Sequence, residues 1–352
     1  MRFFFSATLI LGLTAALRAQ SPTDDSLRRG RLLFLPVVYY SPETNLGFGV
    51  RTAYTFRDRP ESRPSNLPAT LIYTTKKQLI TGFSPDLWLR GNAHHLYGQI
   101  GYLDYPFKFY GIGNNTPENT VEPYTTRIFD VYAGYERRIV RALYAGVRLE
   151  AREENIVERT DLLASGSIPG SAGQSVAGAG LTLTHDSRDD VFFPEKGFYN
   201  QLQVLTYRNR RTDFGGNFQK IRLDLRRYQP VGRGVLALNT LLILTPGDPT
   251  FQYLALIGGE KIMRGYFEGR YRDRNLLVFQ GEYRFSISKQ FKVVAFASTG
   301  RVWNGKNFEL KGFHPAGGAG LRYRVGREKL HLRFDLAYGQ TLYPYFGFTE
   351  AF

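Results

Sequence analysis

Apolar and polar residues alternate along much of the chain, with the period of two that places successive side chains on opposite faces of a β-strand. The alternation is clearest in residues 143–152, 220–226 and 329–336, where the apolar residues share one face and charged residues fill the other. A soluble β-sandwich has the same period, but a face so heavily charged over many long strands favours a water-filled interior. The pattern therefore predicts an all-β fold, a closed antiparallel transmembrane β-barrel of about 16 strands.

The connections between these strands alternate in length. Short ones are expected at 90–93, 140–142, 231–234 and 288–291, and long ones at 114–124, 158–175, 245–275 and 304–316. Outer-membrane barrels have short periplasmic turns and long extracellular loops, so both chain ends are expected on the periplasmic side. The first strands depart from this rule, since 41–45 is short and 57–67 is long.

The first 20 residues predict a secretory signal peptide, with Arg2 before an apolar stretch at 3–17. Residues 21–30 are a short polar leader, and 31–352 are the expected barrel. No later run of about 18 apolar residues predicts a transmembrane helix. Export combined with alternating strands predicts the bacterial outer membrane, with the lipid bilayer as the surrounding partner.

The net charge is +15 and there is no cysteine. The charge suits either a polyanionic partner, such as lipopolysaccharide or nucleic acid, or a basic barrel interior. The basic interior is favoured because the arginines spread along strands, and no nucleic-acid partner is expected. The absence of cysteine excludes disulfides and thiolate metal sites, and we expect neither a metal nor a cofactor.

The chain ends in aromatic residues that are expected to share one face of a final strand: Phe346, Phe348 and Phe352. Such an end resembles the C-terminal signal by which bacterial outer-membrane barrels are recognised, which implies the barrel-assembly machinery as a partner. An ordinary aromatic edge strand is the alternative.

Three stretches carry a more specific resemblance: PVVYYSPETNLGFG at 36–49, HDSRDDVFFPEKG at 185–197 and GGEKIMRGYFEGRYRD at 258–273. They resemble the opening hairpin, a periplasmic turn and the R-G-F/Y loop motif of the BamA/TamA superfamily of outer-membrane barrels, also called the bacterial surface antigen family.

The second stretch contains Asp186, Arg188, Asp189, Pro194 and Gly197. The two aspartates are expected to accept hydrogen bonds from turn amides, while the proline fixes φ and the glycine permits a tight re-entry. A paired-carboxylate active site is the alternative, but a turn explains every one of these residues.

The third stretch places Arg264, Gly265 and Tyr266 in the motif of the long sixth extracellular loop, which in the family folds back into the barrel. By this resemblance Arg264 contacts acidic residues on the barrel wall. Glu282 lies on the polar face of the next strand and is the expected partner. Ser298 stands where the family has a second carboxylate. The expected latch, meaning the contact of Arg264 with the wall that holds the loop, therefore has one charge fewer than in the family.

The resemblance implies a component of outer-membrane protein assembly or protein translocation. Family members usually carry periplasmic POTRA domains, for which the ten-residue leader leaves no room. We therefore expect a barrel that acts without its own POTRA domains, beside a separate periplasmic partner protein. A passive channel or structural barrel remains the alternative. An enzyme is not expected, because none of the five histidines has a catalytic partner at a recognisable spacing.

Overall fold

The computed structural model describes residues 30–41, 45–211, 215–305, 308–325, 330–348 and 350–352. The predicted signal peptide at 1–20 and all but the last residue of the leader lie outside these ranges.

Strands dominate the described chain. In order they are β1 (Arg31–Ser41), β2 (Asn45–Phe56), β3 (Ser65–Thr74), β4 (Leu79–Phe83), β5 (Asp86–Leu89), β6 (His94–Phe109), β7 (Glu122–Val140), β8 (Leu143–Glu158), β9 (Gly173–Asp186), β10 (Gly197–Asn209), β11 (Phe218–Val231), β12 (Gly234–Leu244), β13 (Ala255–Ile257), β14 (Tyr271–Asp273), β15 (Asn275–Ser286), β16 (Phe291–Trp303), β17 (His314–Val325), β18 (Leu330–Tyr338) and β19 (Leu342–Phe348). The expected all-β class is confirmed.

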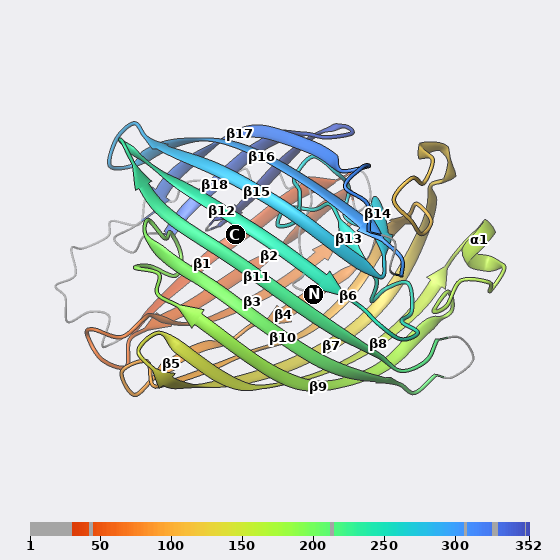
Figure 1. The fold of residues 1–352 in the computed structure, drawn as a ribbon, viewed down its shortest axis with the longest axis horizontal. Coiled ribbons are helices and arrows are strands. Elements are labelled where there is room, and N and C mark those ends of the chain that lie inside the picture. The colour runs from red at the N-terminus through yellow and green to blue at the C-terminus, as the bar shows by residue number, and fades with distance from the viewer. Residues whose placement is uncertain (1–29, 42–44, 212–214, 306–307, 326–329, 349) are drawn as a thin grey trace.

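One antiparallel sheet contains 17 of these strands, and β13 and β14 pair with each other. Neighbours in the sheet follow one another along the chain, except that β12 pairs directly with β15 across the long connection 245–274. β4 and β5 both lie between β3 and β6, so they share one position. Figure 1 shows the sheet curving round on itself, which defines an inner and an outer face.

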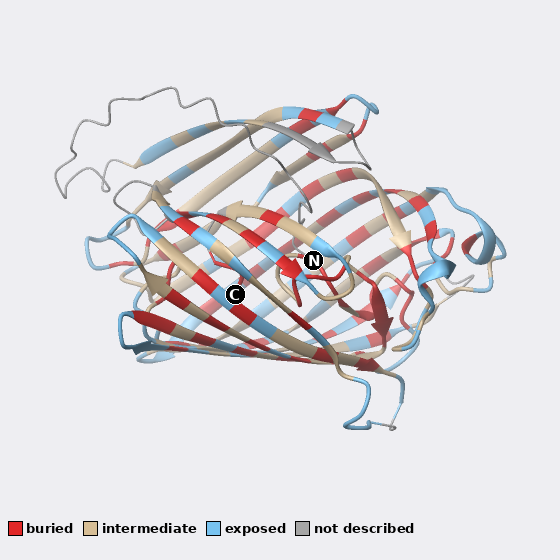
Figure 2. Cartoon of the chain, turned by 90° about the horizontal axis from the view of Figure 1, so that it is seen from above, coloured by how far each residue is buried: buried red, intermediate tan, exposed pale blue. Residues whose placement is uncertain are grey.

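The two faces of this sheet have the reverse of a soluble protein's polarity. On β17, Leu321 and Tyr323 are 53% and 43% exposed, while Arg322 between them is fully buried. Arg333 and Asp335 on β18 are likewise buried on the inner face. Figure 2 shows buried and exposed positions alternating along the strands. Charged groups are almost never buried unless they are paired, and an apolar outer face suits lipid.

The connections divide into two groups, one at each end of the sheet. At the short-turn end they include 90–93, 141–142, 232–233 and 287–290, and at the loop end they include 110–121, 159–172, 245–274 and 304–313. Two short helices, η2 (Glu118–Thr120) and α1 (Asp161–Ala164), lie in loop-end connections. Within the described ranges, no helix has the length and apolar character needed to cross a membrane.

The predicted final strand needs a correction. Phe346 and Phe352 do not share one face of it, because β19 ends at Phe348. The ring of Phe346 lies 4.7 Å from that of Phe334, whereas Phe352 is buried with Tyr228 and Ala237 on the inner side. The reason lies between them, where Glu350 binds Arg322 and draws the tail inward. The role of Phe352 in assembly stays a prediction.

Candidate functional site

The long connection 245–274 lies against the inner face of β15–β19. The Met263 amide donates to Gln280 Oε1 at 3.0 Å, and the Tyr266 hydroxyl donates to the Pro315 carbonyl at 2.7 Å. Met263 and Tyr266 also belong to a buried apolar cluster with residues of β12–β17. Because the segment is bonded and packed at several points, it forms part of the wall and not a solvated loop.

Gly265 brings this segment into close approach with the backbone at the end of β18. Its φ is +108°, and a Cβ added there would lie 2.7 Å from the Gly339 amide nitrogen. Its amide donates to the Tyr345 hydroxyl at 3.0 Å, and its carbonyl accepts from the Gln340 amide at 3.1 Å. Only glycine combines this backbone conformation with this lack of space.

Arg264 is the central contact of the site, and its side chain is 3% exposed. Its guanidinium donates to Glu282 at 2.7 Å and also binds Asp335, so it bridges carboxylates from β15 and β18. The guanidinium also lies 3.6 Å from the centre of the Phe296 ring. A planar fork that meets two carboxylates and an aromatic face fixes both position and orientation.

The pair belongs to a larger buried network with equal numbers of opposite charges. Its cations are Arg264, Arg284, Arg322 and Arg333, and its carboxylates are Glu260, Glu282, Asp335 and Glu350. The closest contacts beyond Arg264 are Arg322–Asp335 at 2.6 Å and Arg284–Glu282 at 2.7 Å. Burying charge is tolerable only when partners compensate it, and this balance supplies them.

The structure brings the predicted residues Arg264 and Glu282 together, and the second carboxylate at Arg264 comes from another strand than the one that carries Ser298. Ser298 lies opposite Gln280 in the β15–β16 ladder, and the second carboxylate at Arg264 is Asp335 on β18. The expectation of a latch one charge short is therefore wrong. The loop arginine reaches across to a different strand because the inserted segment spans several of them.

The turn between β9 and β10 holds the second predicted motif. Asp189 Oδ1 accepts the Glu195 amide at 2.9 Å and the Lys196 amide at 3.2 Å, and Gly197 has φ +103°. Asp186 Oδ1 accepts the Arg188 amide at 3.2 Å, as expected, and its carboxylate also binds the guanidiniums of Arg188 and Arg63.

The same turn also projects an aromatic side chain into the interior. Asp190, which the motif did not single out, accepts the amides of Phe192 and Phe193 at 2.8 Å each. Phe193 is fully buried against His331, with ring centres 4.1 Å apart. The Pro194 carbonyl accepts from Arg284 at 3.2 Å, which joins this turn to the charged network.

An apolar outside, a charged inside and a long connection pinned to the inner wall are the features of an outer-membrane β-barrel with an inserted loop. The model of the Omp85 superfamily domain matches residues 134–345. Since this match covers more than half of the sequence, the chain belongs to the Omp85 superfamily. The expected relation to BamA-type barrels and the expected bacterial outer-membrane location are confirmed.

Solved structures of the same fold agree. BamA from Haemophilus ducreyi lacking POTRA domains 1–3 matches with a TM-score of 0.58 and 13% identity, over 91% of this chain and 70% of that one. CdiB from Acinetobacter baumannii gives 0.56 and 12%, over 91% and 59%. CdiB from Escherichia coli gives 0.54 and 13%, over 88% and 59%. The chain thus spans about three fifths of each CdiB chain. No curated protein matches the sequence.

Proposed function

We propose that this Omp85 protein is a non-enzymatic barrel that assists the assembly of outer-membrane proteins or the translocation of polypeptides. We further propose that it closes as a 16-stranded barrel, because β4 and β5 share one position and the 17 strands of the sheet therefore fill 16 positions. Closure would join β1 to β19, which each pair with one neighbour in the described sheet.

The observation that carries this proposal is the short ladder of the last strand. β19 pairs with β18 over residues 342–348, and the chain then turns inward so that Glu350 meets Arg322 at 2.9 Å. Pro344 in β19 and Pro36 in β1 each remove one backbone donor from the two strands that would meet. A join with few hydrogen bonds can open, and its edges can then template an incoming strand.

The charged network supports this role by making the neighbouring wall rigid. Arg264 ties the inserted segment to β15 and β18, so opening is confined to the β1–β19 join. The expected periplasmic partner protein stays a prediction.

Because the chain has no native cysteine, pairs of introduced cysteines can test whether the β1–β19 join must open. Cysteine pairs would be scanned along 33–37 of β1 and 342–346 of β19, in proteoliposomes that receive an unfolded outer-membrane barrel as client. We expect oxidation to stop client folding and reduction to restore it. The matched control is Phe34→Cys with Thr52→Cys, which face each other within the β1–β2 ladder.

A passive channel predicts a different result. It would conduct ions in planar bilayers, would not accelerate client folding, and would respond equally to both kinds of tether. That outcome would overturn the proposed role in assembly or translocation.

A further inference from the structure

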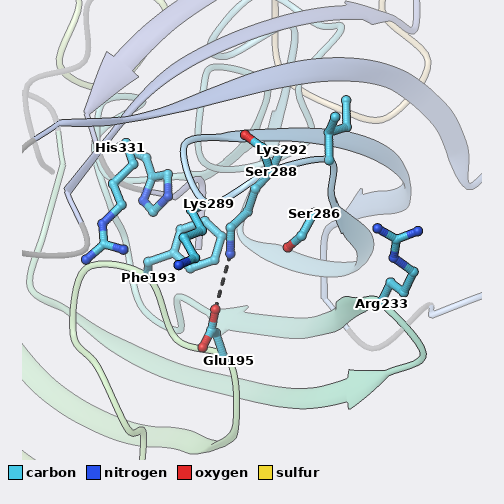
Figure 3. A pocket seen from close by; sticks show the side chains of 10 residues that line it. Phe193, Glu195, Arg233, Ser286, Ser288, Lys289, Lys292 and His331 are labelled. Atoms are coloured by element: carbon cyan, nitrogen blue, oxygen red, sulfur yellow. Dashed lines mark hydrogen bonds and ion pairs between the residues drawn. The ribbon is translucent and has the colours of Figure 1, made fainter.

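A cavity of ≈ 410 Å³ lies at the short-turn end of the sheet, beside the turn that carries Phe193. Its walls come from the connections 187–196, 232–233 and 287–290 and from the adjoining ends of β16, β17 and β18. Residues that line it include Phe193, Glu195, Arg233, Lys289, Lys292 and His331 (Figure 3). Phe193 and Glu195 lie in the 185–197 stretch but were not among its predicted site residues, and the other four lie outside both predicted motifs.

The strand register shows that this cavity belongs to the inner face. Lys292 lies opposite Arg322 in the β16–β17 ladder, and paired residues project from the same face of a sheet. Arg322 is fully buried in the charged network, so Lys292 also points inward. Lipid around the barrel contacts the outer face, whereas a solute at the short-turn end reaches this cavity.

The charge of the cavity differs from that of the network beside it. The network has four cations and four carboxylates, whereas the part of the cavity lining formed by described residues brings the cations Arg233, Lys289 and Lys292 together with one carboxylate, Glu195. A concave wall with an excess of one charge concentrates ligands of the opposite charge. The ligand that fits is an anion.

The floor of the cavity is apolar and rigid. Phe193 stacks near His331, and the ammonium of Lys292 lies 4.0 Å from the centre of the Phe193 ring. The backbone amide of Phe193 is fixed by Asp190, so its ring is positioned before any ligand arrives. Cations above an aromatic floor suit a ligand that combines carboxylates with apolar side chains.

Two carboxylates of the chain itself already bind cations on this wall. Glu195 binds Lys292 at 3.2 Å, and its side chain is 37% exposed, so it can move aside (Figure 3). Glu350 in the C-terminal tail binds Arg322 on the same wall. Both show polypeptide carboxylates bound by the cations of this wall.

We propose that this cavity binds an acidic, partly apolar segment of a polypeptide that enters from the periplasmic side. Carboxylates of the segment meet Arg233, Lys289 and Lys292, and an apolar side chain packs on Ile287, which lines the cavity and is 57% exposed. Glu195 is an internal competitor that the segment displaces from Lys292. The inference rests on the proposed function for the identity of the ligand as a client polypeptide, but binding is measurable without any client folding.

The test uses the full barrel in nanodiscs of zwitterionic lipid and fluorescence anisotropy of a labelled 12-residue peptide of alternating Glu and Leu. We expect Arg233→Gln with Lys289→Gln to weaken binding roughly tenfold, since two exposed cations are lost. Glu195→Gln should tighten binding roughly twofold to threefold, because it removes the competitor. The matched control is Arg211→Gln with Arg274→Gln, which removes two exposed cations from loop-end connections and should change nothing.

Three further results would contradict the proposal. Equal binding of the same peptide with Gln in place of Glu would show that the cavity does not require carboxylates in its ligand. Displacement by inorganic phosphate, but not by chloride at equal ionic strength, would assign the cavity to phosphate. Loss of peptide binding in phosphatidylglycerol nanodiscs would assign it to lipid headgroups. If the untethered barrel does not accelerate client folding while peptide binding stays intact, the proposed function alone is overturned.

Discussion

Two parts of the inner face are stabilised in opposite ways. The wall of β15–β18 buries a network of arginines and carboxylates around Arg264. The wall formed by β3, β4, β6 and β7 buries Ile72, Ile80, Leu103 and Ile128, and Val37 of β1 packs against this apolar cluster. The ion-pair network distinguishes the first wall, which also has an apolar cluster around Met263, and the isoleucine-rich cluster distinguishes the second, which also has polar pairs such as Gln99 with Asp130.

The difference indicates which side of the β1–β19 join can move. Charge-assisted bonds require a fixed geometry, and breaking one leaves a buried charge without compensation. Apolar side chains tolerate small shifts, because the hydrophobic effect has no preferred direction. The wall of β3, β4, β6 and β7, against which β1 packs, is therefore the deformable side of the join, and the wall of β15–β18 is the fixed side.

The largest expected effect comes from breaking the latched wall at Arg264→Ala. The change leaves Glu282 and Asp335 buried without their shared partner, which costs about 3–5 kcal/mol. We expect the 245–274 segment to become cleavable by protease in proteoliposomes and the thermal midpoint to fall.

The control for this change is Arg274→Ala, whose 3.5 Å pair with Asp248 is exposed and should be worth about 0–1 kcal/mol. Because Arg264 and Glu282 share one interaction, the double alanine variant should lose less than the sum of the single losses. Strict additivity, or an uncleaved segment in Arg264→Ala, would show that the network does not hold the loop.

A smaller effect is expected at Gly265→Ala, which leaves every charge in place. The added methyl group meets the backbone of Gly339 and forces a residue other than glycine to φ +108°, at a cost of about 1–3 kcal/mol. The segment should become partly cleavable. Gly305→Ala is the matched control, since Gly305 also has positive φ but nothing lies within 4 Å of its added Cβ. Equal effects at both glycines would assign the loss to backbone strain alone.

These residues also show how far the sequence could predict the site. Strand alternation directed Glu282 inward, and the motif identified Arg264, so their pairing followed. Asp335 also lay on the polar face of 329–336, but its distance from Arg264 depends on the register of strands β15–β18, which alternation does not specify. Phe352 was misplaced because a tertiary contact, Glu350 with Arg322, ends the periodicity before the last residue.

On the apolar wall we expect a loss of stability without a change in the loop. Ile80 is 3% exposed, and Ile80→Val removes one buried methylene, which costs about 1 kcal/mol. The thermal midpoint should fall slightly while protease protection of 245–274 stays as in the unmodified protein. Cleavage of the segment in this variant would show that the two walls are coupled, and would remove the distinction between a fixed and a deformable side.

The smallest expected effect is a pH dependence inside the inserted segment itself. Burial raises the pKa of Glu268 to about 7, and Glu260 adds to this shift while Arg272 opposes it. An unfolded glutamate titrates near 4.3, so the folded segment binds more protons between these values and its stability falls as the pH rises through about 7. We expect cleavage of 245–274 to increase roughly twofold to threefold from pH 5.5 to pH 8, the modest size reflecting solvent screening.

Glu268→Gln should abolish the increase, and Glu309→Gln, at an exposed carboxylate in 304–313, should leave it unchanged. A pH dependence that survives Glu268→Gln would place the titrating group in the wall and not in the segment it holds.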